Sequence, residues 1–135
     1  MGGTAVPGEP KPSLPQRGPA PAVDRMSNAE LTRMIEAEHA YRGKALFELC
    51  DRVPQDDDAA TKVAMLSRLE SLRKARLFDR VSLAWSAIIA LLAAETGHAR
   101  EEAYAAFGAL STVEQQDMLD YLEVKSIEEA HPRIT

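Results

Sequence analysis

The chain has 135 residues, the size of one domain, and its 45% hydrophobic and 27% charged residues are typical of a globular protein. A formal net charge of −5 argues against a duplex-DNA binder that works through overall charge. A single cysteine excludes an internal disulfide and a zinc site made of cysteines alone.

Residues 1–25 differ in composition from the rest, because they hold six of the eight prolines and four of the seven glycines. They contain no aromatic residue and no apolar periodicity, so they cannot bury enough surface to offset their ordering entropy. We expect a disordered Pro/Gly-rich tail over 1–25 and a helical domain over 26–131. The tail lacks the apolar run of a secretory signal, and a cytoplasmic protein is expected.

The first predicted helix begins at Ser27, which forms a capping-box pattern with Glu30. Apolar residues then recur at helical spacing over 31–53. We expect one helix over this range, with Gly43 in its middle.

The next predicted helical region begins at the aspartates of 56–58, which suit a helix N-terminus. No glycine or proline interrupts 56–96, so this region is either one long helix or two. Polar residues favour a break near 74–79. Residues 81–94 are apolar on nearly every face but too few to cross a bilayer, which predicts a buried central helix and no transmembrane segment.

Two shorter helices are predicted at the C-terminal end. Gly97 is expected to end the central helix, and a short helix follows over 98–107. Ser111 and Glu114 form a second capping-box pattern that opens the last helix, which Pro132 closes. With few aromatic residues and many alanines and leucines, the sequence predicts an all-α fold, a compact bundle of about five helices.

Residues 103–122 resemble the terminal helix of bacterial di-haem c-type cytochromes in their Phe-x-Ala-Leu-Ser-x-x-Glu-Gln pattern. The haem attachment sequence Cys-x-x-Cys-His is absent from the chain. No function is therefore carried over from this resemblance.

Each histidine follows a glutamate by three residues, as Glu36/His39, Glu95/His98 and Glu128/His131. Glu-x-x-His on a helix is the paired ligand unit of ferritin-like di-iron bundles. One hypothesis is therefore a metalloprotein that binds iron or another divalent metal through Glu36, His39, Glu128 and His131. Ordinary surface pairing is the simpler interpretation, and no cofactor is expected with it.

Three arginines, Arg73, Arg76 and Arg80, would form a positive strip if their helix continued. Guanidinium groups suit bidentate contacts with carboxylates or phosphates. We expect these arginines and Trp85 to contact a partner, because arginine and tryptophan dominate interface energetics. A core position is an equally good interpretation for Trp85. A solvated, ion-paired face is the alternative interpretation, and a nucleic-acid partner is disfavoured.

No Ser/His/Asp arrangement, phosphate-binding glycine loop or zinc spacing is present, and Cys50 lies beside the apolar stripe of its helix as a core residue would. An enzyme is therefore not favoured. The apolar central helix is large for so small a domain, and surplus apolar surface often ends in an interface. We expect a non-enzymatic helical protein–protein interaction module, such as a small subunit, adaptor, chaperone or regulator. It would dock to a partner or to itself as a homodimer.

Overall fold

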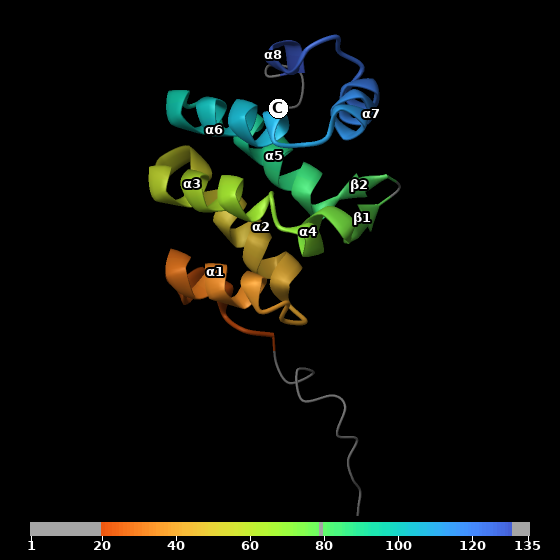
Figure 1. Ribbon diagram of the computed structural model, residues 1–135. Coiled ribbons are helices and arrows are strands. Elements are labelled where there is room, and N and C mark those ends of the chain that lie inside the picture. Colours follow the sequence, from red (N-terminus) through yellow and green to blue (C-terminus); the bar gives the residue numbers. More distant parts are fainter. Residues whose placement is uncertain (1–19, 79, 131–135) are drawn as a thin grey trace, which may run out of the picture.

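The computed structural model describes residues 20–78 and 80–130, and most of them are helical (Figure 1). The α-helices are α1 (Asn28–Glu36), α2 (Arg42–Arg52), α3 (Asp57–Leu66), α4 (Glu70–Lys74), α5 (Leu83–Ala93), α6 (Gly97–Gly108), α7 (Thr112–Leu122) and α8 (Ile127–Ala130). Two 3₁₀ helices, η2 (Val23–Arg25) and η3 (Val53–Gln55), and two short strands, β1 (Arg76–Phe78) and β2 (Val81–Ser82), complete the described elements. The predicted helical fold is confirmed, with more and shorter helices than the five expected.

The N-terminal boundary of the packed region lies before residue 26. Val23, which we expected in the tail, is 6% exposed and belongs to the core. Its carbonyl oxygen accepts a hydrogen bond from Arg52 of α2 at 3.1 Å. The rest of the predicted tail, residues 1–19, lies outside the described residues.

The single helix expected over 31–53 is wrong, because α1 ends at Glu36 and α2 begins at Arg42. Glu38 between them adopts a left-handed backbone with φ 57°. The predicted start is confirmed: Ser27 Oγ accepts from the Glu30 amide, and the Glu30 carboxylate accepts from the Ser27 amide at 2.8 Å. Gly43 therefore lies in the first turn of α2 and not in the middle of a helix.

α3 begins as predicted, because the Asp56 carboxylate accepts hydrogen bonds from the amides of Asp58 and Ala59. α3 ends at Leu66, and α4 ends at Lys74. The predicted break near 74–79 is present, but it is a β-hairpin: β1 pairs antiparallel with β2, with Arg76 opposite Ser82.

The predicted central helix is confirmed as α5, which packs against α2, α3, α4 and α6. Its buried residues lie around most of its circumference, as expected for a helix that is apolar on nearly every face: Leu83, Ala84, Trp85, Ala87, Ile88, Leu91 and Leu92. No helix in the described ranges combines the length and apolar character needed to cross a bilayer.

The C-terminal helices differ from the prediction at their ends. Glu95, with φ 61°, is the left-handed residue after α5, and Gly97 is the first residue of α6. α7 ends before Glu123, which is also left-handed, and α8 follows as a separate short helix. Pro132, which we expected to close the last helix, lies outside the described residues.

Candidate functional site

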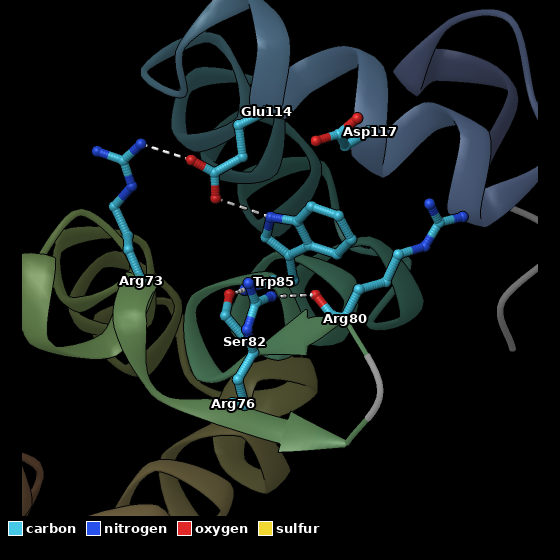
Figure 2. A pocket seen from close by; sticks show the side chains of 7 residues that line it. All are labelled: Arg73, Arg76, Arg80, Ser82, Trp85, Glu114 and Asp117. Carbon is cyan, nitrogen blue, oxygen red and sulfur yellow. Dashed lines mark hydrogen bonds and ion pairs between the residues drawn. The ribbon is translucent and has the colours of Figure 1, made fainter.

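The four residues expected to contact a partner line one pocket. Arg73, Arg76, Arg80 and Trp85 surround a cavity of about 330 Å³, together with Ser82, Glu114 and Asp117 (Figure 2). This volume is at the lower end of the range of small-ligand pockets, and it suits one or two side chains of a partner. The spacing of the arginines and the residue type of Trp85 therefore selected four residues that the fold brings together.

The three arginines reach the pocket by a different route from the helical strip that we expected. Arg73 lies in the last turn of α4, Arg76 begins β1, and Arg80 lies in the hairpin turn. Arg76 Nη1 donates to the Arg80 carbonyl oxygen at 2.8 Å, which fixes its guanidinium across the hairpin. The hairpin, and not a continuous helix, therefore gathers the positive charges.

Trp85 forms part of the pocket wall and is otherwise a core residue, with 4% of its surface exposed. It lies in the first turn of α5, where its amide donates to Ser82 Oγ at 3.0 Å. Its indole Nε1 donates to Glu114 Oε2 at 2.9 Å. A buried indole N–H requires such a partner, so this bond fixes the ring at the edge of the pocket.

Glu114 is the pocket residue for which the sequence predicted another role. Ser111 Oγ accepts from the Glu114 amide, as a capping box predicts. The Glu114 carboxylate, however, takes part in tertiary contacts: Oε1 pairs with Arg73 Nη2, and Oε2 accepts from Trp85 (Figure 2). Glu30 and Glu114 are each the third residue of their helix. Glu30 caps α1 locally, whereas Glu114 of α7 joins α4 and α5 through Arg73 and Trp85.

The remaining charges of the pocket are not neutralised in pairs. Among residues 20–78 and 80–130, no carboxylate forms an ion pair with Arg76 or Arg80. The Arg80 guanidinium lies over the Tyr121 ring, 5.6 Å from its centroid. Asp117 lines the pocket, and within the same ranges it pairs with no cation. Within these ranges, the Arg76 and Arg80 guanidinium groups therefore have no carboxylate partner.

Two large apolar side chains of the hairpin are exposed. Leu77 and Phe78 follow Arg76 in β1 and are 38% and 55% exposed. Exposed large apolar residues on the element that carries Arg76 suit a protein-binding surface.

The three described residues of the metal hypothesis, Glu36, His39 and Glu128, are not brought together. Glu36 is the last residue of α1, and His39 lies in the following turn, where its Nδ1 accepts from the Tyr41 amide at 3.0 Å. Glu128 belongs to α8, and α1 and α8 lie at opposite ends of the molecule (Figure 1). His131 lies outside the described residues. Within the ranges that the structure describes, no three His, Cys, Asp or Glu side chains gather to hold a metal ion.

The middle histidine pair is also separated by a helix end. His98 lies in the first turn of α6, whereas Glu95 precedes that helix. His98 instead contacts Glu102 at 3.4 Å and Thr61 Oγ1 of α3 at 2.8 Å. These contacts join α3 to α6 on the surface.

Cys50 lies on α2, where it is half-buried and packs against the core. Burial raises the pKa of the Cys50 thiol from 9.0 to about 12, and the neighbouring Asp51 carboxylate contributes to the rise. The thiol is therefore protonated at neutral pH, which suits a packing residue and not a nucleophile.

Alkylation measures this protonation state. We expect folded protein at pH 8 to react with iodoacetamide at least about a hundredfold more slowly than the urea-unfolded chain. The reason is that the thiolate fraction of Cys50 is far smaller in the folded protein. Because the folded-state pKa is raised, the neutral thiol contributes stability that is present below pH 9 and lost as the pH rises towards 12. Equal rates for the folded and unfolded chain would contradict this assignment.

Comparison with protein-family models, curated proteins and solved structures gave no match for this chain. Its function is therefore inferred from the pocket itself.

Proposed function

We propose that this protein is a non-enzymatic docking module and that its arginine pocket binds an acidic segment of a partner protein. The observation that carries the proposal is the convergence of Arg73, Arg76, Arg80 and Trp85 on one pocket. A guanidinium binds a carboxylate through two parallel hydrogen bonds, which gives orientation as well as energy.

The chemistry of the surface supports a protein partner. Arg76 and Arg80 offer the charges, while Leu77 and Phe78 of the same hairpin offer exposed apolar area. Interfaces combine such an apolar region with a few anchoring arginine and aromatic residues. An acidic segment that also carries apolar residues is complementary to both parts of this surface.

A nucleic-acid partner is less compatible with the same pocket. The whole chain carries a net charge of −5, so it lacks the extended positive field of non-specific binders.

Selection from a library of displayed random peptides tests the proposal, because it requires no identified partner. We expect the enriched peptides to be acidic and to contain apolar residues. Their affinity should fall at least about tenfold for the Arg76→Glu/Arg80→Glu variant, because two attractive charges become repulsive.

The matched control is Arg25→Glu/Arg33→Glu, which changes the net charge equally at two exposed positions on η2 and α1. We expect it to bind the selected peptides within about threefold of the original chain, because it leaves the pocket contacts intact. Neutral or basic peptides, or equal losses in both double variants, would contradict the proposal. If the original chain and the control variant form a dimer and Arg76→Glu/Arg80→Glu does not, the acidic partner is a second copy of this chain.

A further inference from the structure

Glu114 already occupies part of the pocket with a group like the one that the pocket is proposed to bind. Its two carboxylate oxygens contact Arg73 and the indole N–H of Trp85. Both groups belong to the pocket lining that an acidic ligand would contact together with Arg76 and Arg80. The side chain is 21% exposed, so it lies within the pocket and not free in solvent.

We infer that Glu114 is an intramolecular competitor: its carboxylate holds part of the binding site, and an acidic partner side chain replaces it and releases α7. This inference depends on the proposed function, and it specifies the ligand group as the side-chain carboxylate of a peptide. The exchange forms and breaks only non-covalent contacts, because one carboxylate leaves Arg73 as another arrives.

The weak attachment of α7 favours this exchange. Met118 is the only buried residue of this helix. Leu119, Tyr121 and Leu122 are only partly buried where they pack against the core. Tyr121 also contacts two pocket residues: its ring lies 6.1 Å from the Trp85 ring, centroid to centroid, and Arg80 lies over the same tyrosine. An element that buries little apolar surface is detached at low free energy. A ligand in the pocket would thus disturb the contacts of Glu114 and Tyr121, which are part of the attachment of α7.

Arg76 and Arg80, which pair with no carboxylate in the described ranges, provide the first contact for a ligand. They attract a ligand carboxylate while Glu114 still holds Arg73. A guanidinium has five N–H donors, so Arg73 can contact a second carboxylate before the first one leaves. The apparent affinity for the ligand is then lower than the intrinsic affinity of the open pocket, because only the molecules in which Glu114 has left the site are fully competent to bind.

Titration with hexaglutamate, acetylated and amidated so that only side-chain carboxylates are charged, tests the inference. Trp85 is the single tryptophan of the chain, so its fluorescence reports directly on the pocket. We expect Glu114→Gln to bind the peptide at least about tenfold more tightly than the original chain, since it no longer supplies a competing charge. The glutamine oxygen can still accept from the indole N–H, which preserves the local geometry.

Asp120→Asn is the matched control, because it removes one negative charge from an exposed position of the same helix that does not line the pocket. If Glu114 acted only through the net charge of α7, both variants would gain equally. We expect Asp120→Asn to change the affinity less than about threefold. One outcome would overturn the role of Glu114 as a competitor and leave the docking function intact. In that outcome the original chain and Glu114→Gln bind hexaglutamate with equal affinity, and Arg76→Glu/Arg80→Glu weakens the binding of both. Absence of binding in every variant would contradict both.

Hydrogen exchange gives a second, independent measurement. We expect saturating hexaglutamate to increase amide exchange in α7 of the original chain, because α7 loses its attachment. Hexaglutamine at the same concentration should leave the exchange unchanged. Protection of α7 by hexaglutamate would overturn the release step.

Discussion

Replacing Ile88 by alanine is expected to lower the free energy of unfolding by about 3 kcal/mol, since it removes most of a fully buried side chain and leaves a cavity. Ile88 lies on α5, the helix that packs against α2, α3, α4 and α6. A cavity at this position would be lined by several helices, and it would persist because these helices cannot all move to fill it. Urea unfolding followed by circular dichroism measures the change.

The neighbouring isoleucine provides the matched control. Ile89 is only partly buried, although it lies on the same helix and Ile89→Ala removes the same atoms. We expect its cost to be about half that of Ile88→Ala or less, because part of its surface already contacts water. Equal costs for the two variants would show that helix propensity, and not burial, determines the loss.

The second large effect is expected at Asn28, which joins three helices near the N-terminal end. Its amide nitrogen donates to Asp56 at 3.0 Å and to Asp58 at 2.9 Å, while its oxygen accepts from Arg52 at 2.8 Å. Three hydrogen bonds to charged groups converge on one small side chain. We expect Asn28→Ala to lower the free energy of unfolding by about 2 kcal/mol, measured by urea unfolding at pH 7.

The pH dependence of the same variant gives a second signature. The hydrogen bonds from Asn28 are the main cause that lowers the pKa of both Asp56 and Asp58 below 3.8. The stability contributed by these depressed pKa values is present above about pH 4 and is lost as the pH falls through the folded-state values. We therefore expect a smaller loss of stability between about pH 4 and pH 2 in Asn28→Ala than in the original chain. Identical slopes would contradict this network.

Local signals in the sequence predict several elements correctly. The capping box at Ser27, the aspartate cap at Asp56 and the apolar run of α5 all depend on neighbouring residues, and the structure confirms each. The break between α1 and α2 lacks a glycine or proline at its centre. Its signal is an interruption of the apolar stripe, because Glu38 and His39 occupy positions that would face the core in a continued helix.

The hairpin and the site depend on tertiary contacts that single-sequence reasoning does not provide. Arg76, Leu77 and Phe78 form a strand through pairing with β2, and no alternation of polar and apolar residues marks that pairing. The arginine spacing correctly selects pocket residues although the assumed helix is absent. The sequence predicts only a local cap at Glu114, because nothing in its neighbourhood indicates Arg73, which lies 41 positions earlier.

The separation of pocket and scaffold along the chain has an evolutionary consequence. Every described pocket residue lies between Arg73 and Asp117, so α1, α2 and α3 serve as scaffold and provide none of them. Cores tolerate many hydrophobic replacements when volume and pattern are kept, so the scaffold can diverge in sequence far faster than the pocket. Distant descendants of this protein would then share little overall identity. They would be recognised by three arginines, a tryptophan five residues after the last arginine, and a glutamate at the start of a separate helix.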